Sequence, residues 1–262
     1  MSEADAFRIL DAAFSLGIRA FDTAEAYGSS AERLRAWIDA RRNAGEVKVI
    51  TKCSVDSLAK SARSALSRFA GIPELLLLTH GAVGKDQWSI VLASCKRHRA
   101  QAGQSVYTDA EVRAVADFAD MERIQVPGNV FDRRAIMARG ARAVPLDVRS
   151  IYLQGVLLED PESAELRAPG AGRLSAAAQT AAARLDLERA PLLIASMLRR
   201  IAPRDRLVVG VDDAAELDVL PKAFEISHDA AHQFADEIDA VIGNDSLDEV
   251  LDPRRWPQSK VE

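Results

Sequence analysis

The chain has 262 residues, of which 48% are hydrophobic, and a formal net charge of −5. This length suits one barrel-sized domain or two smaller ones, and the negative charge argues against nucleic acid or an anionic membrane as a partner. Its two cysteines, Cys53 and Cys95, are too few for a disulfide framework or a structural zinc site. With no membrane-length apolar run and no basic start typical of a signal peptide, we expect a cytoplasmic protein with reduced thiols and no metal.

An amphipathic helix is expected first, over residues 3–17. Helices are also expected over 30–44, 54–70 and 109–121, where apolar residues recur every three or four positions and a Ser or Asp stands at the start as a cap. Several short apolar runs are apolar on both faces, as strands of a buried parallel sheet must be. There are seven such runs, at 18–24, 47–53, 74–80, 104–108, 123–129, 147–153 and 206–212.

The connection between the sixth and seventh runs is long. It contains a loop rich in Pro and Gly at 160–172, followed by helical patterns at 174–188 and 191–202. A long connection of this kind is typical of a functional excursion and equally of a tolerated surface insertion, and the sequence leaves both interpretations open.

The alternation of strands and helices predicts an α/β fold with a parallel sheet, either closed as a barrel or open and doubly wound. Seven strands after a leading helix favour a (β/α)8 TIM barrel with an incomplete N-terminal strand. Such a barrel would leave two sheet edges open, and either another segment or a second subunit, in an oligomer, would have to cover them. No low-complexity linker divides the chain, so a single domain over 1–262 is expected.

Polar residues end three consecutive runs. The first run leads to Asp22, with Tyr27 in the loop that follows; the second ends near Lys52 and the third at His80. In parallel barrels the working residues come from the carboxyl ends of the strands. We therefore expect these four side chains to meet on one face of the barrel.

Each of the four residues alone has an ordinary explanation, since a strand-end aspartate caps a turn and a lone histidine makes a structural hydrogen bond. Together they describe acid–base chemistry. A charged Lys52, oriented by Asp22, favours the phenolate form of a neighbouring tyrosine. Tyr27 is then predicted to protonate a carbonyl oxygen as a hydride arrives, or to deprotonate an alcohol in reverse, while His80 donates a hydrogen bond to the substrate oxygen.

At this point the sequence resembles the aldo-keto reductase family, specifically its compact bacterial members. The similar segments are "FDTAEAYGSSAERL" with the lysine and histidine strands "VITK" and "LLLLTH", and later "VYTDAEVRAVADF", "RIQVPGNVFDRR", "RSIYLQGVLL" and "LVVGVDDAAEL". The resemblance implies a barrel that binds a nicotinamide dinucleotide and reversibly reduces a small-molecule carbonyl, an aldehyde, ketone or sugar-like substrate, to an alcohol. It also implies that Asp22, Tyr27, Lys52 and His80 are catalytic.

The resemblance further implies a set of cofactor-binding residues. Ser105 and Gln125 match positions that hold the nicotinamide carboxamide, and Ser150 matches a cofactor contact on the next strand. Arg149 stands where many members have an aromatic ring that stacks on the nicotinamide; its planar guanidinium could stack instead. Val106 stands where many have an asparagine beside the serine, which removes one carboxamide contact.

The adenosine end differs most from the family pattern. Asp212 and Asp213 stand where many members carry groups that bind a 2′-phosphate. A carboxylate repels a phosphate and accepts a hydrogen bond from a ribose hydroxyl, so NAD(H) is favoured over NADP(H). The alternative, about equally supported, is that both acids simply cap the following helix.

Two functions from different classes follow. The first is an NAD(P)-dependent oxidoreductase; the alternative is a barrel with a degraded cofactor site, acting as a non-redox enzyme or an interaction subunit. His228 and His232 lie four residues apart on a predicted helix, which we interpret as solvated rather than metal-binding.

Overall fold

A computed structural model describes residues 1–142, 144–242 and 247–257. The chain forms two compact units. Unit 1 comprises Met1–Val126, Ala135–Asp147 and Gly210–Leu217; unit 2 comprises Pro127–Arg134, Val148–Val209 and Asp218–Glu262, as far as the latter is described. The prediction of one domain over the whole chain stays a prediction.

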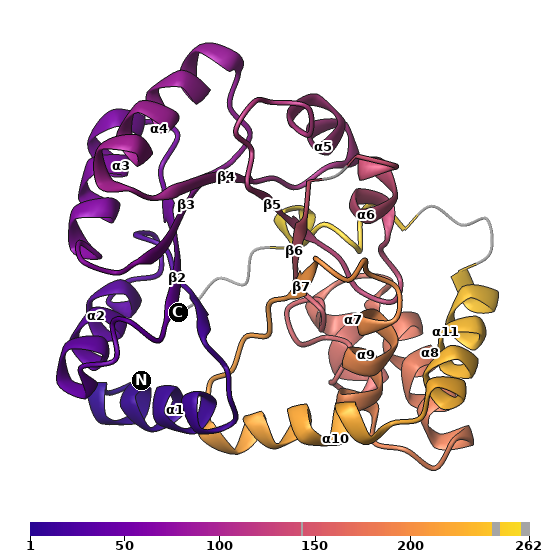
Figure 1. The fold of residues 1–262 in the computed structure, drawn as a ribbon. Coiled ribbons are helices and arrows are strands. Elements are labelled where there is room, and N and C mark those ends of the chain that lie inside the picture. Colours follow the sequence, from indigo (N-terminus) through magenta and orange to yellow (C-terminus); the bar gives the residue numbers. More distant parts are fainter. Residues whose placement is uncertain (143, 243–246, 258–262) are drawn as a thin grey trace. The chain divides into compact units, whose positions relative to one another are not determined.

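The strands follow one another in the sheet in the order β1 to β7 (Figure 1). They are β1 (Ala20–Asp22), β2 (Lys48–Cys53), β3 (Glu74–His80), β4 (Gln101–Ser105), β5 (Arg123–Pro127), β6 (Leu146–Arg149) and β7 (Arg206–Leu207). The pairs from β1–β2 to β4–β5 are parallel, with helices between the strands. The α/β fold with seven strands in place of eight is therefore confirmed within the described residues.

The predicted fourth strand, at 104–108, was placed three residues too late, because β4 spans Gln101–Ser105. Val106, Tyr107 and Thr108 are strong strand formers, but Thr108 begins a helix instead. Its side chain accepts a hydrogen bond from the backbone N–H of Glu111, and the Glu111 carboxylate accepts one from the Thr108 backbone. This capping box starts α5 (Asp109–Val115) and ends the extended segment.

The helices of unit 1 are α1 (Glu3–Ser15), α2 (Ser30–Arg41), α3 (Leu58–Arg68), α4 (Lys85–His98), α5 and α6 (Arg134–Arg139). α3 packs on β2 and β3 while α4 packs on β4 (Figure 1). On β2 and β3, the side chains of Ile50, Leu76 and Leu78 form one buried apolar cluster. These residues alternate with others along each strand, as the two-residue period of a sheet requires.

Unit 2 is mainly helical. Its helices are α7 (Pro161–Arg167), α8 (Ala171–Arg184), α9 (Arg189–Leu198), α10 (Val219–Glu225) and α11 (His228–Ile242), followed by the 3₁₀ turn η2 (Pro253–Arg255). α7 packs on α8, and α11 packs on both α8 and α9.

The predicted loop at 160–172 was wrong, because α7 occupies most of it. The Asp160 carboxylate accepts a hydrogen bond of 3.0 Å from the Ser163 backbone N–H, and Pro161 takes the first helical position. Both residues favour the start of a helix: the Asp160 carboxylate caps a free backbone N–H, and Pro161 has no N–H that would be left unpaired in the first turn. Gly170 ends this segment with φ 86°, and α8 follows directly.

Gly103 on β4 supports a specific stability prediction. A Cβ at this position would clash with the backbone carbonyl oxygen of Arg123 and lie 2.6 Å from the Cδ2 atom of Leu78. Because a neighbouring strand cannot move away easily, we expect Gly103→Ala to lower the free energy of unfolding by about 3 kcal/mol. Urea denaturation followed by circular dichroism measures the change.

Gly45→Ala is the matched control, since a Cβ there would have nothing within 4 Å. Its free energy of unfolding should stay within about 0.5 kcal/mol of the wild type. Equal midpoints for the two variants would contradict the close strand approach at Gly103.

Candidate active site

Lys52 is a buried charge at the carboxyl end of β2, with its side chain 1% exposed. Its Nζ donates hydrogen bonds to the Oδ1 atom of Asp22, at the end of β1, and to the backbone oxygen of Thr23 at 3.2 Å. A desolvated ammonium is stable in a protein interior only when it is paired and hydrogen-bonded. The Asp22 carboxylate and the Thr23 carbonyl therefore pair the buried Lys52 ammonium and hold it in one orientation.

The loop after β1 folds back over this pair. Tyr27 donates its backbone N–H to the oxygen of Ala24 at 3.1 Å, and its own carbonyl oxygen accepts from the Ser30 N–H at 3.1 Å. Gly28 adopts φ 57°, in the left-handed region that residues with a Cβ avoid. The Thr23 and Ser30 hydroxyls, 3.0 Å apart, close the two ends of the loop. This short turn holds the Tyr27 side chain beside the strand ends.

The Tyr27 ring contacts two of the predicted partners. Lys52 Nζ lies 5.0 Å from its centroid, within the range of a cation–π interaction. His80, the last residue of β3, packs against it edge to face, with the ring centroids 5.9 Å apart and the planes at 88°. Tyr27 is 45% exposed although Lys52 beneath it is buried. The structure therefore brings together the four residues predicted at the ends of β1, β2 and β3.

Ser105 and Gln125 join the same cluster from β4 and β5. In the sheet register, His80 is beside Ser105 and Ser105 is beside Gln125. The Ser105 hydroxyl donates to Gln125 Oε1 at 3.2 Å, and Gln125 Nε2 donates to Asp22 Oδ2 at 2.8 Å. Both side chains are buried. The bond from Gln125 to Asp22 was not predicted, because it joins residues 103 positions apart.

Ser105 and Gln125 have the chemistry that a nicotinamide carboxamide requires. A carboxamide offers N–H donors and a carbonyl acceptor, so it needs partners of both kinds. Beyond its two bonds, the amide of Gln125 has one further N–H and one further lone pair, and the Ser105 hydroxyl has lone pairs. This donor and acceptor set fits the group, although Val106 beside it is apolar.

Two of the remaining predicted cofactor residues lie in unit 2. Arg149, at the end of β6, has its NH1 atom 3.4 Å from the Ser150 hydroxyl oxygen. Ser150 adopts φ 63°, unusual for a residue with a side chain. Leu153 and Gln154 in the same loop also have positive φ angles. The predicted contacts of Arg149 and Ser150 with a cofactor stay predictions.

Asp212 and Asp213 behave differently from each other. The Asp213 carboxylate accepts a 2.8 Å hydrogen bond from the Ala215 N–H at the start of η1 (Ala214–Asp218), so it caps this turn. The backbone N–H of Asp212 donates a hydrogen bond to the Glu216 carboxylate, and Asp212 is exposed. The helix-cap interpretation therefore applies to Asp213, while Asp212 carries an exposed carboxylate.

The sequence did not indicate a role for Glu25, which anchors the Tyr27 loop. The Ser61 hydroxyl on α3 donates a hydrogen bond to the Glu25 carboxylate and accepts one of 2.8 Å from the Ser54 backbone. Since Glu25 and Ser61 are 36 residues apart, no local pattern could have paired them.

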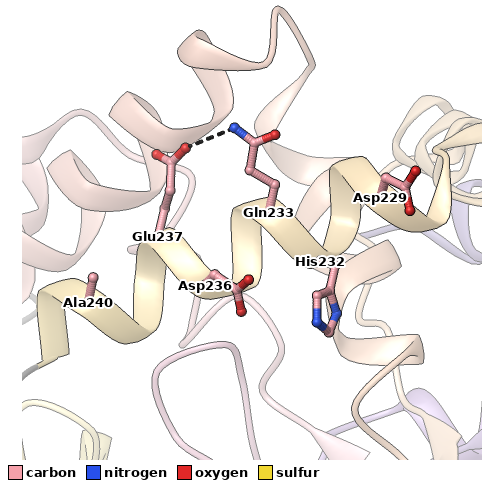
Figure 2. A pocket seen from close by; sticks show the side chains of 6 residues that line it. All are labelled: Asp229, His232, Gln233, Asp236, Glu237 and Ala240. Carbon is pink, nitrogen blue, oxygen red and sulfur yellow. Dashed lines mark hydrogen bonds between the residues drawn. The ribbon is translucent and has the colours of Figure 1, made fainter.

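An open surface pocket of about 600 Å³ lies along α11. None of the residues that line it is a predicted site residue. It is lined by Asp229, His232, Gln233, Asp236, Glu237 and Ala240. Figure 2 shows Gln233 and Glu237 on one side of the helix, while His232 and Asp236 point to the other.

Among the described residues, no group of three or more His, Cys, Asp or Glu side chains could hold a metal ion. None of the described helices is both long and apolar enough to cross a bilayer.

Comparisons with known proteins agree with the fold. Residues 1–71 match the model of the aldo/keto reductase family. A glycerol dehydrogenase from Gluconobacter oxydans has a similar structure, with a TM-score of 0.75 and 17% identity over 94% of this chain and 88% of that chain. An aldo-keto reductase from Bacillus halodurans, in its apo form, has a TM-score of 0.69 and 16% identity over 96% and 91%. A comparison with curated proteins finds no match.

A third similar structure is a thermostable aldo-keto reductase in complex with the inhibitor epalrestat. It has a TM-score of 0.68 and 18% identity, over 90% of this chain and 88% of that chain. The chain therefore has the fold of the aldo-keto reductases, and the resemblance seen in the sequence is confirmed. Its first 71 residues, which contain Asp22, Tyr27 and Lys52, match that family directly.

The two thiols are predicted to be inert in the folded protein. Burial raises the pKa of Cys53, next to Lys52, to about 12, and the charge of Glu25 adds to the effect. Burial also raises the pKa of Cys95 to about 12, with a smaller effect of Cys53. Because the nucleophile is the thiolate, a disulfide reagent below pH 9 should label neither thiol in the native chain and both in concentrated urea.

The sign of the accompanying pH dependence follows from the same shifts. Both folded-state pKa values lie above the value of 9.0 expected for an exposed thiol, so the unfolded chain loses these protons first. Their contribution to stability is complete below pH 9 and is lost as the pH rises toward 12. Rapid native labelling of Cys53 would contradict its burial.

Proposed function

We propose that this protein is a nicotinamide-dependent oxidoreductase that interconverts a carbonyl and an alcohol, with Tyr27 as the general acid and base. The observation that carries the proposal is the contact of the Tyr27 ring with both Lys52 and His80 at the ends of neighbouring strands. The carboxyl ends of the strands are the functional face of parallel barrels. The similarity to aldo-keto reductases supports the same chemistry.

Tyr27 is suited to exchange a proton with a substrate oxygen because it is half exposed over a buried cation. In the direction of reduction, its hydroxyl gives a proton to the carbonyl oxygen, which leaves a phenolate. The buried ammonium of Lys52, held by Asp22, stabilises this negative charge. In the direction of oxidation the phenolate takes the proton of the alcohol.

His80 serves as a second group at the same oxygen. Its ring packs edge to face against the Tyr27 ring, and we infer that both side chains border the position of the substrate oxygen. An imidazole N–H directed there would donate a hydrogen bond to the carbonyl oxygen, which polarises the C=O bond and orients the substrate. We therefore assign His80 to substrate binding and Tyr27 to proton transfer.

The cofactor would be held by Ser105 and Gln125 at its carboxamide. When bound, a nicotinamide supplies or accepts the hydride that the protein's side chains cannot. Asp212 would accept a hydrogen bond from the adenosine ribose, which favours NAD(H). The substrate is a small aldehyde, ketone or sugar-like alcohol. The structural neighbour named as a glycerol dehydrogenase makes glycerol and glyceraldehyde the first pair to assay.

Tyr27→Phe tests the proton-transfer role. The variant keeps the ring that packs on Lys52 and His80 and removes only the hydroxyl. We expect turnover to fall by about 10²- to 10⁴-fold, the usual contribution of a general acid, with cofactor affinity changed by no more than a few fold. Steady-state kinetics and fluorescence titration with NADH and NADPH measure the two quantities.

Tyr152→Phe is the matched control, because it removes a hydroxyl that lies 3.4 Å from the backbone oxygen of Ala190. It should keep most of the turnover. Wild-type turnover retained in Tyr27→Phe would end the proposed role of Tyr27. A folded wild-type protein that binds neither cofactor would instead support a barrel that has lost redox chemistry.

Asp212→Arg tests the cofactor preference. The substitution replaces an exposed carboxylate by a guanidinium, which pairs with a 2′-phosphate and no longer accepts from a ribose hydroxyl. We expect the affinity for NADPH relative to NADH to rise about tenfold, the effect of roughly 1.4 kcal/mol. Fluorescence titration with each cofactor gives the ratio.

Asp236→Arg makes the same change of charge at an exposed position of α11 and serves as the control. Its affinity ratio should stay that of the wild type. If Asp212→Arg also leaves the ratio unchanged, Asp212 does not face the adenosine end of the cofactor.

A further inference from the structure

Gln125 links the predicted nicotinamide position to the catalytic ion pair. Its Nε2 donates to Asp22 Oδ2 at 2.8 Å, and its Oε1 accepts from the Ser105 hydroxyl at 3.2 Å. The other oxygen of Asp22 accepts from Lys52. Ser105, Gln125, Asp22 and Lys52 thus form one continuous hydrogen-bonded chain from β4 to β2, and its last member lies against the Tyr27 ring.

The direction of every bond in this chain follows from the charge of Asp22. An ionised carboxylate only accepts hydrogen bonds, so the nitrogen end of the Gln125 amide must face it. The oxygen end then faces Ser105, and the serine hydroxyl must donate. With its single proton committed in this way, Ser105 meets any further ligand as an acceptor.

Burial makes the chain rigid. Gln125 is fully buried and Ser105 is 1% exposed, so water cannot easily replace a lost partner. An amide or carboxylate left unpaired in such surroundings costs more than an ordinary hydrogen bond contributes. Gln125 therefore fixes the carboxylate plane of Asp22, and through it the position of the Lys52 ammonium.

We propose that Gln125 is a positioning residue of the Asp22–Lys52 pair, in addition to any contact with the cofactor. This proposal rests on the proposed function, since it assigns Gln125 to the proton-transfer half of the site. It differs from the role implied by family resemblance, in which the glutamine only holds the carboxamide.

Gln125→Met separates the two roles. Methionine fills a similar volume and has no group that binds Asp22 or Ser105. If Gln125 positions the ion pair, kcat at saturating cofactor should fall by at least tenfold, while the dissociation constant for NADH rises less than fivefold. Ser105→Ala breaks the chain one bond further away and should lower kcat less than Gln125→Met does.

Gln104→Met is the matched control. Gln104 is also fully buried, lies beside Ser105 in the sequence, and accepts a hydrogen bond from the Val83 backbone at 2.8 Å. Its loss should lower stability and leave kcat within twofold of the wild type. The proposal is overturned if Gln125→Met raises the dissociation constant for NADH tenfold or more with kcat unchanged.

A second measurement needs neither cofactor nor turnover. In an NMR spectrum of the wild-type protein without cofactor, the side-chain NH₂ signals of Gln125 are identified by their loss in Gln125→Met. Asp22→Asn replaces the carboxylate acceptor by a weaker neutral one and should shift these signals upfield. Asp56→Asn, at an exposed position after β2, should not shift them.

The two arms distinguish failure of this proposal from failure of the proposed function. If the wild type binds no nicotinamide cofactor but Asp22→Asn shifts the Gln125 signals, the oxidoreductase proposal fails and the positioning contact stands. If the chemical shifts of the Gln125 NH₂ signals are the same in Asp22→Asn as in the wild type, Gln125 does not hold Asp22, and the positioning proposal fails whether or not the protein is an oxidoreductase.

Discussion

The buried ion pair of Lys52 and Asp22 is the interaction on which the site depends. Removing an ammonium from water costs several kcal/mol, and the cost is offset only when its partners stand in fixed places. Two of these partners, Asp22 and the carbonyl oxygen of Thr23, lie at the end of the three-residue strand β1. The pairing of β1 with β2 is therefore needed for the charge as well as for the sheet. A shift of one residue in that register would turn Asp22 to the opposite face.

The same pair decides how Tyr27 can act. One side of its ring faces a cation that cannot leave, and nearly half of the residue faces outward. Three local devices keep it there: the left-handed Gly28, the Thr23–Ser30 contact, and Glu25 bound to Ser61 on α3. Proton transfer needs this combination of a buried charge and an accessible hydroxyl, because a substrate oxygen has to reach the phenol while the Lys52 ammonium stays shielded from water.

Much of this site could be predicted, because strand ends are local signals. Apolar runs that end in Asp22, near Lys52 and in His80 are enough to predict that these side chains lie at neighbouring strand ends. Elements whose limits depend on capping were predicted less well, as β4 and α7 show. Contacts such as Gln125 with Asp22 and Glu25 with Ser61 depend on register and on helix packing over long sequence separations. Nothing in the neighbouring residues specifies them.

A second buried ion pair shows why the first one indicates chemistry. Arg123 at the start of β5 binds Asp147 on β6 at 2.7 Å and also donates to the backbone oxygen of Leu146, so it joins two strands near their amino ends. Apolar side chains of similar volume often replace such pairs without loss of stability, and neither pair is explained by stability alone. The pair of Lys52 and Asp22 differs in lying at the strand ends, beneath an exposed tyrosine and beside a histidine. At this place the pair provides what two apolar side chains could not. It fixes a positive charge beside Tyr27, where the charge can stabilise a phenolate.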